Sequence, residues 1–363
     1  MKQVLVAGAS GLVGRGAIRA FAHEPDCKVI AVSRRAPEGV GSVHHLAVDL
    51  FDPRACEAAF SPLTGVTHLV FTALYEKANG LLASWLDPQQ IEGNAAMLRN
   101  LFGPLSRAAP NLRHVTLLQG TKAYGAHVRQ IPVPAREDRD ELKTQPNFYW
   151  NQEDYLRERQ RGQRWSFTIL RPQVIFGDAI GAAMNPVAAF GLYGALLKEQ
   201  GEPLYFPGGV ANVFEGVDAD LVGRAIRWAG EADSARNQAF NVTNGDVMTW
   251  RGVWPAIADA LGMSPGEDRP ARLSDILTAR SAQWDAMRRK YALAAPDLAA
   301  FAGQSLDYVD LLMAGDRVRM PALVSTVKLR QAGFTGTMDS EAMLRAAISA
   351  MQARKLLPPR TIS

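Results

Sequence analysis

The stretch that decides the fold is Val4-Leu5-Val6-Ala7-Gly8-Ala9-Ser10-Gly11-Leu12-Val13-Gly14. The apolar run Gln3–Ala7 predicts a strand, and the pattern over Leu12–Ala22 predicts a helix. Gly8 allows a sharp turn after the strand, Gly11 leaves room for a pyrophosphate, and Gly14 permits close packing of helix on strand. The free N–H groups and positive dipole end of the helix suit phosphates. This strand, glycine turn and helix therefore predict a dinucleotide-binding domain.

The chain that follows alternates strand and helix patterns. Further strands are predicted over Lys28–Ser33, His45–Asp49, Thr67–Thr72, Arg113–Leu118 and Ser166–Leu170. Helices are predicted over Pro53–Phe60, Gln90–Ala109 and Asn147–Gln160. Such alternation implies βαβ units. We therefore expect an α/β fold with a doubly wound parallel sheet, which is the Rossmann fold.

Beyond residue 177 the pattern becomes less regular and mainly helical. Strands are predicted over Asn212–Asp218 and Ala239–Thr243, and helices over Asp220–Ala229, Arg251–Leu261, Leu273–Tyr291 and Ser340–Arg354. We assign residues 1–177 plus about 208–245 to an NADP-binding domain, and about 178–207 plus 246–363 to a smaller region that caps the substrate. The uncharged stretch Ala179–Leu197 barely reaches spanning length, so we interpret it as a buried helix lining an apolar pocket.

Composition excludes several classes of protein. The chain has 40 Lys and Arg against 36 Asp and Glu, a net charge of +4 that is too small and scattered for nucleic acid. Cys27 and Cys56 lie far apart without a histidine at ligand spacing, which argues against a disulfide framework or a metal site and fits a reducing cytosol. We expect a soluble cytoplasmic protein with no membrane partner, and we leave a homodimer open.

The second strand predicts which cofactor binds. It ends in Ser33-Arg34-Arg35, where an NAD-selective site would carry an acid for the ribose hydroxyl. Two guanidinium groups suit a 2′-phosphate instead, which indicates NADPH. Asp49-Leu50 is expected to flank adenine, and the backbone of Thr72-Ala73 to pass the cofactor. The cofactor-binding residues predicted so far are Gly8, Ser10, Gly11, Leu12, Val13, Gly14, Ser33, Arg34, Arg35, Asp49, Leu50, Thr72 and Ala73.

The catalytic pattern of ordinary short-chain dehydrogenases, Tyr-x-x-x-Lys, is missing. Glu153 stands four residues after Tyr149, and Arg159 stands four residues after Tyr155. A lysine is found instead after the fifth strand, in Gln119-Gly120-Thr121-Lys122-Ala123-Tyr124.

These motifs together identify a family. The sequence resembles the progesterone 5β-reductase/iridoid synthase-like (PRISE) family, a branch of the extended short-chain dehydrogenases, from residue 1 to about residue 355. The shared motifs are Arg34-Arg35, Gly120 to Tyr124, Asn147-Phe148-Tyr149 through Glu153-Asp154, Arg171-Pro172 and Phe240 to Asp246. The resemblance implies that Tyr149 and Lys122 are catalytic and bind the cofactor. It also implies that Gln119, Pro172 and Ile175 lie around the nicotinamide, and that NADPH reduces the C=C bond of activated enones.

Two regions depart from the family. Leu306-Asp307-Tyr308 stands where many plant members carry an aromatic run, and the segment after Tyr124 is shorter and includes His127. Steroid or iridoid specificity therefore cannot be carried over, and we leave open whether His127 or Tyr308 lines the pocket.

The leading hypothesis for function is NADPH-dependent reduction of the C=C bond of a small apolar enone or enal. An alternative is a carbonyl reductase, or a sugar-nucleotide epimerase or dehydratase, of the same extended fold. The missing Tyr-x-x-x-Lys argues against both. A third hypothesis is a non-catalytic protein that senses NADP, but such a protein would have no need of Tyr149 and Lys122. The sequence leaves the physiological substrate and the product stereochemistry open.

Overall fold

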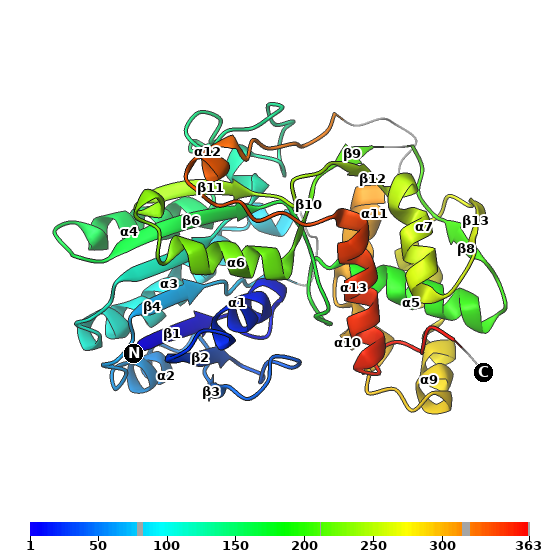
Figure 1. The fold of residues 1–363 in the computed structure, drawn as a ribbon, viewed down its shortest axis with the longest axis horizontal. Coiled ribbons are helices and arrows are strands. Elements are labelled where there is room, and N and C mark those ends of the chain that lie inside the picture. The colour runs from blue at the N-terminus through cyan, green and yellow to red at the C-terminus, as the bar shows by residue number, and fades with distance from the viewer. Residues whose placement is uncertain (78–82, 211, 314–319, 362–363) are drawn as a thin grey trace. The chain divides into compact units, whose positions relative to one another are not determined.

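The computed structural model describes residues 1–77, 83–210, 212–313 and 320–361. The chain forms two compact units, which are drawn in Figure 1. The first unit comprises Met1–Gln173, Ala219–Thr243 and Ala322–Gly336. The second comprises Val174–Asp218, Asn244–Pro321 and Thr337–Ser363.

A parallel sheet of seven strands forms the centre of the first unit. In sheet order the strands are β11 (Gln238–Val242), β6 (Ser166–Pro172), β5 (His114–Leu118), β4 (His68–Phe71), β1 (Lys2–Ala7), β2 (Cys27–Ser33) and β3 (His44–Ala47). The chain runs outward from β1 to β3, crosses back to β4 and continues to β11. The strand order therefore reverses between β1 and β4, where doubly wound folds bind ligands at the carboxyl ends. The predicted fold class is confirmed.

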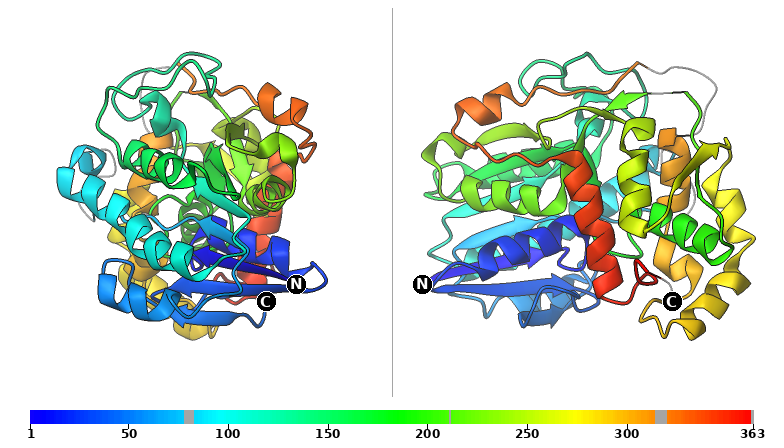
Figure 2. Two further views of the ribbon diagram at one scale, coloured as in Figure 1. Left: turned by 90° about the vertical axis from the view of Figure 1, so that its left-hand side faces the viewer. Right: turned by 45° about the vertical axis from the view of Figure 1, so that its right-hand side comes forward.

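Helices cover both faces of this sheet. On one face α1 (Leu12–Ala22) packs against α6 (Ala219–Ala229). On the other, α3 (Pro88–Ala108) packs against both α2 (Pro53–Phe60) and α4 (Phe148–Gln160), as Figures 1 and 2 show. Because both faces are covered, the central strands are largely apolar, and Val4 to Ala7 of β1 are completely buried.

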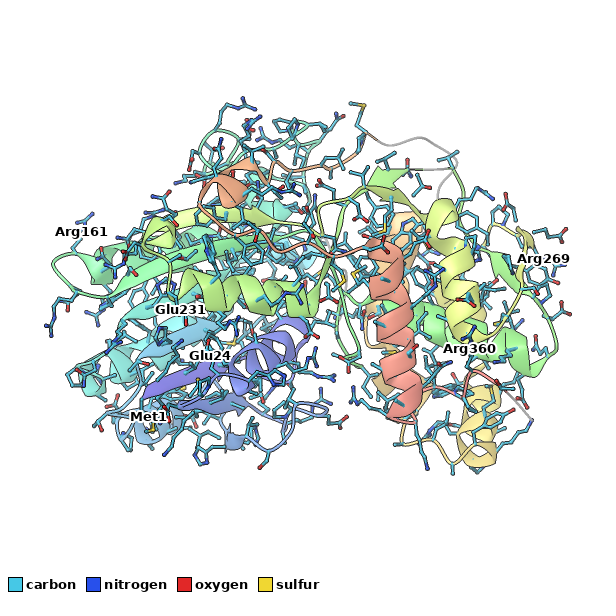
Figure 3. All side chains as sticks on the ribbon, viewed as in Figure 1. Met1, Glu24, Arg161, Glu231, Arg269 and Arg360 are labelled. Carbon is cyan, nitrogen blue, oxygen red and sulfur yellow. The ribbon has the colours of Figure 1, made fainter. Side chains whose placement is uncertain are left out.

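Charged groups hold the amino-terminal end of β1. The Lys2 ammonium pairs with Glu24 at 2.7 Å and also with Glu231, and Figure 3 labels both carboxylates. These contacts lie at the end of the strand opposite the glycine turn, so they anchor the sheet without entering the predicted cofactor site.

The second unit is mainly helical. Its helices are α5 (Pro186–Glu199), α7 (Trp250–Leu261), α8 (Leu273–Thr278), α9 (Ser281–Lys290), α10 (Leu298–Ala302), α11 (Ser305–Met313) and α13 (Ser340–Ala353). Three strand pairs accompany them: β7 (Val174–Phe176) with β10 (Gly216–Asp218), β8 (Leu204–Phe206) with β13 (Pro265–Asp268), and β9 (Val213–Phe214) with β12 (Met248–Thr249). Helix α5 is buried from Pro186 to Leu197, so the uncharged stretch does contain a buried helix, which starts later than its first residue. No helix in the described part of the chain is long and apolar enough to cross a bilayer.

The two largest differences from the expected boundaries each have a long-range pairing as their cause. Residues 208–218 fall in the second unit because β9 and β10 pair with β12 and β7. Residues 322–336 fall in the first unit, where Ala135 exchanges backbone hydrogen bonds of 2.9 Å with Leu323 and Ser325. Here also lies α12 (Val327–Gln331), which packs on β11.

The single helix predicted over Leu273–Tyr291 is wrong, because the structure has α8 and α9 there with a break between them. The Asp310 carboxylate accepts hydrogen bonds from the Leu273 and Ser274 N–H groups at 2.6 and 3.1 Å. This cap comes from α11, so local sequence does not reveal it.

Candidate active site

The glycine turn after β1 is shaped by its close neighbours. Gly8 has a φ of +81°, and a Cβ there would lie 2.6 Å from the Ala73 backbone nitrogen. A Cβ on Gly14 would overlap the Gly8 carbonyl oxygen. Both positions therefore require glycine, one for the turn beside β4 and one for the packing of α1 on that turn.

The start of α1 fits the phosphates of a dinucleotide. Gly11 occupies the N-cap position, which has no side-chain cap, and the first turn of α1 carries no acidic residue. The N–H groups at this helix end are therefore available for an anion, with Ser10, Leu12 and Val13 around them. Arg34 and Arg35 are exposed after β2, and neither guanidinium bonds to another residue in the described part of the chain. The residues present thus suit a dinucleotide that carries a 2′-phosphate.

Three of the predicted cofactor residues have side chains that brace loops. The Thr72 hydroxyl donates to the Ala7 carbonyl at 2.8 Å, and the Ser33 hydroxyl donates to the Arg35 carbonyl at 2.6 Å. The Asp49 carboxylate accepts from the Phe51 N–H at 3.0 Å, while Leu50 is buried. The side chains of these residues shape the loops at the carboxyl ends of the strands.

Lys122 and Tyr149 come together in the first unit. Lys122 lies on the short 3-10 helix η2 (Thr121–Tyr124) after β5, and Tyr149 lies in the first turn of α4. Asn147 links them, since its side chain accepts from the Tyr149 N–H at 3.0 Å and donates to the Lys122 carbonyl at 3.3 Å. The Tyr149 hydroxyl lies 3.3 Å from the point where a Gly120 Cβ would stand, and the Pro172 carbonyl lies 3.6 Å from the same point.

An indole forms the common wall of this pair. Trp85, on the 3-10 helix η1 (Ala83–Leu86), is completely buried. The Lys122 Nζ lies 3.9 Å from its ring centroid, and the Tyr149 ring centroid lies 5.3 Å away. The Phe148 ring packs on the same indole at 4.7 Å. The two predicted catalytic side chains thus meet an aromatic surface that limits the access of water.

Burial sets the protonation of both groups. It lowers the pKa of Lys122 to about 8, and the Glu76 carboxylate opposes that shift. Burial raises the pKa of Tyr149, with a further increase from Glu76 and a decrease from Arg171. Near neutral pH the pair is therefore an ammonium group beside a phenol that keeps its proton.

A buried network of polar side chains contacts the backbone of Tyr149. Gln119 accepts from the Arg171 Nε at 2.8 Å and donates to Glu153 at 3.1 Å and to the Tyr149 carbonyl at 3.3 Å. Glu153 also accepts from Arg157 at 2.7 Å, and Arg171 donates to Glu141 at 2.6 Å. Gln119 therefore joins the end of β5 to α4 through its Nε2 and to Arg171 of β6 through its Oε1. Its predicted place beside the nicotinamide stays a prediction.

The remaining predicted residues lie in different parts of the chain. His127 is next to the pair, with its ring 6.1 Å from that of Trp85, and burial lowers its pKa to about 4, so the imidazole is neutral. Ile175 in β7 and Tyr308 in α11 belong to the second unit. In the described residues no three His, Cys, Asp or Glu side chains gather in a way that could hold a metal ion.

Two residues beside the pair were missed by sequence reasoning, namely Glu76 and Trp85. Both follow β4 in a segment without helix or strand periodicity. A signal that could have drawn attention to them is the place of a carboxylate and an indole soon after the carboxyl end of a central strand, where doubly wound folds bind ligands.

The chain is similar to known proteins in sequence and in fold. Residues 56–322 match the PRISE-like Rossmann-fold domain. The (S)-8-oxocitronellyl enol synthase of Antirrhinum majus is 29% identical over 98% of this chain and 92% of that protein. An enzyme of the same name from Nepeta racemosa is 33% identical over 77% of this chain and 74% of its own. The 3-oxo-Delta(4,5)-steroid 5-beta-reductase of Arabidopsis thaliana is 29% identical over 98% of this chain and 92% of that protein.

Solved structures are similar in fold. The UDP-glucose 4-epimerase of Thermotoga maritima with UDP-glucose has a TM-score of 0.67 at 17% identity, over 97% of this chain and 99% of that one. The UDP-glucose 4-epimerase of Thermus thermophilus in complex with NAD has a TM-score of 0.64 at 19% identity, over 96% of this chain and 99% of that one. These likenesses show the extended fold alone, whereas the family match rests on the sequence itself. The chain therefore belongs to the PRISE-like Rossmann-fold domain family, as its motifs predicted.

Proposed function

We propose that this protein reduces the C=C bond of a small apolar α,β-unsaturated ketone or aldehyde with NADPH. The observation that carries the proposal is that Lys122 and Tyr149 both contact the buried indole of Trp85. The similarity to a steroid 5-beta-reductase and to 8-oxocitronellyl enol synthases supports it.

The glycine turn, the start of α1 and the pair Arg34-Arg35 would hold NADPH, which supplies the hydride when bound. The Tyr149 hydroxyl would donate a hydrogen bond to the substrate carbonyl oxygen as negative charge develops on it. Lys122 places a positive charge beside the same group, which favours that charge in a site with little water. The enolate that results takes a proton at its α-carbon from solvent.

The position and contacts of Glu153 argue against reduction of the carbonyl itself and against epimerase chemistry. Ordinary short-chain dehydrogenases use a lysine four residues after the tyrosine in a proton relay to oxygen. Here that position is a carboxylate, buried and bound to Arg157 and Gln119. A donor that stabilises an enolate oxygen does not need this relay, so the geometry favours attack at the β-carbon.

Incubation of the protein with cyclohexenone and NADPH tests the proposal. We expect cyclohexanone as the main product by gas chromatography and mass spectrometry. The allylic alcohol as main product would contradict the proposal and favour a carbonyl reductase. Binding of NADPH without its oxidation in the presence of any enone, enal or ketone would favour the NADP-sensing protein.

A further inference from the structure

A carboxylate lies beside the predicted catalytic pair and takes no part in the chemistry described above. Glu76 follows β4, and its Oε1 accepts a hydrogen bond of 2.9 Å from the Trp85 Nε1. Its Oε2 is shielded from solvent and has no hydrogen-bond partner in the described part of the chain. A carboxylate oxygen that is shielded from water without a hydrogen-bond partner is costly, so its placement needs a physical reason.

The indole that Glu76 holds is the element on which the pair rests. Its N–H edge binds the carboxylate, while the Lys122 Nζ lies 3.9 Å from its ring centroid. Tyr149 meets it edge to face, with an angle of 72° between the ring planes. Rotation of the indole would therefore move the surface that Lys122 and Tyr149 share.

We propose that Glu76 is a positioning residue, which fixes the Trp85 indole and thereby holds the Lys122 ammonium group on the surface shared with Tyr149. This inference rests on the proposed function, since it assigns Glu76 a part in the same reaction. Glu76 touches neither the substrate nor the cofactor in this account and acts through Trp85.

The charge of Glu76 works in the same direction as its hydrogen bond. Glu76 acts electrostatically on both Lys122 and Tyr149, Arg171 acts on Tyr149, and Lys122 acts on the neutral His127. Glu76 raises the pKa of both Lys122 and Tyr149. It therefore favours the ammonium form of the lysine and the protonated form of the tyrosine, which are the forms that the reaction requires.

Two variants separate the hydrogen bond from the charge. Glu76→Gln keeps an oxygen acceptor for the indole N–H and removes the charge, so we expect the alkaline limb of kcat/KM to move to lower pH. Glu76→Leu removes both, and the pair loses its alignment. We expect kcat to fall on the order of tenfold or more, with the KM for NADPH unchanged. Glu92→Gln is the control, since Glu92 is an exposed residue of α3 that pairs with Arg99.

A measurement of the protonation of Lys122 makes the test independent of enzyme turnover. The rate of reductive methylation of Lys122 by formaldehyde and a borohydride reagent, followed by mass spectrometry across pH, reports its protonation. The midpoint should shift to lower pH in Glu76→Gln and stay at the wild-type value in Glu92→Gln. An unchanged midpoint in Glu76→Gln overturns the inference, as does a wild-type kcat in Glu76→Leu.

The two proposals can fail separately. If the wild-type protein reduces no enone, the proposed function fails, while the methylation midpoints still report whether Glu76 acts on Lys122. If the wild type reduces enones and both Glu76 variants match it, only the positioning role fails. Should Glu76→Leu not fold, Glu76→Gln still gives both the pH profile and the methylation midpoint.

Discussion

The phosphate loop and the catalytic pair are built in opposite ways. The loop is backbone from neighbouring residues, Gly8 to Gly14, shaped by the absence of side chains. The pair depends on side chains from three separate segments, which bring Glu76, Trp85, Lys122 and Tyr149 together. The predicted cofactor loop is therefore determined by residues that are close in sequence. The arrangement of the predicted catalytic side chains depends on tertiary packing instead.

The largest expected effect is at the reacting end. Tyr149→Phe keeps the ring that packs on Trp85 and removes the hydroxyl. We expect a loss of about 3 kcal/mol of transition-state stabilisation, roughly a hundredfold in kcat, with a smaller change in KM. Steady-state kinetics with cyclohexenone check this. A kcat within a factor of two of wild type would show that Tyr149 is a wall of the site and no donor.

The corresponding test of the cofactor end replaces Arg34 and Arg35 with alanine. Charge-assisted hydrogen bonds to a partly exposed phosphate are worth about 1.5–3 kcal/mol. The kcat/KM for NADPH should therefore fall roughly ten- to a hundredfold, while the kcat/KM for NADH stays nearly unchanged. Arg161→Ala is the control, because Arg161 is exposed after α4 and is labelled in Figure 3. Equal kcat/KM for the two cofactors in the wild type would remove the basis for NADPH.

The network under the pair gives a test of stability. Gln119→Leu leaves Arg171 and Glu153 without an amide partner in a buried region. We expect the free energy of unfolding to fall by about 1–3 kcal/mol in urea denaturation. The exposed Gln163→Leu should leave it unchanged. Equal effects of the two substitutions would mean that Gln119 is not a link between β5 and α4.

A smaller effect is expected from pH. Lys122 acts as an ammonium group, and its pKa is lowered by burial to about 8. The active form is present below that pH and is lost as pH rises through it, so kcat/KM should halve near pH 8. Lys122→Arg keeps its charge at every pH tested and should abolish this decline, even if its kcat is lower. A decline that persists in Lys122→Arg would assign it to another group.

Much of the first unit could be predicted because its signals are local. The glycine spacing from Gly8 to Gly14 and the strand–helix alternation are sufficient for the parallel sheet. Lys122 and Tyr149 were singled out by the resemblance and by the missing lysine at position 153, and the structure brings them together. The cap at the start of α8 and the return of residues 322–336 to the first unit depend on Asp310 and Ala135, which act across long sequence separations.

The site was less predictable than the fold for the same reason. The place of Gln119 near the nicotinamide stays a prediction from the resemblance. The sequence does not reveal that its amide is held by Arg171 and Glu153, which come from other elements. Trp85 and Glu76 lie in an irregular segment, so no periodicity marks them. Only the packed structure shows that this indole and its carboxylate support the pair.

The central claim is that hydride reaches the β-carbon while Tyr149 and Lys122 hold the carbonyl oxygen. The most direct measurement uses NADPH carrying deuterium at the transferred position of C4, with cyclohexenone as substrate. The account predicts cyclohexanone labelled at the β-carbon, and a much lower yield of that product with Tyr149→Phe. Deuterium on the carbinol carbon of an allylic alcohol would contradict it.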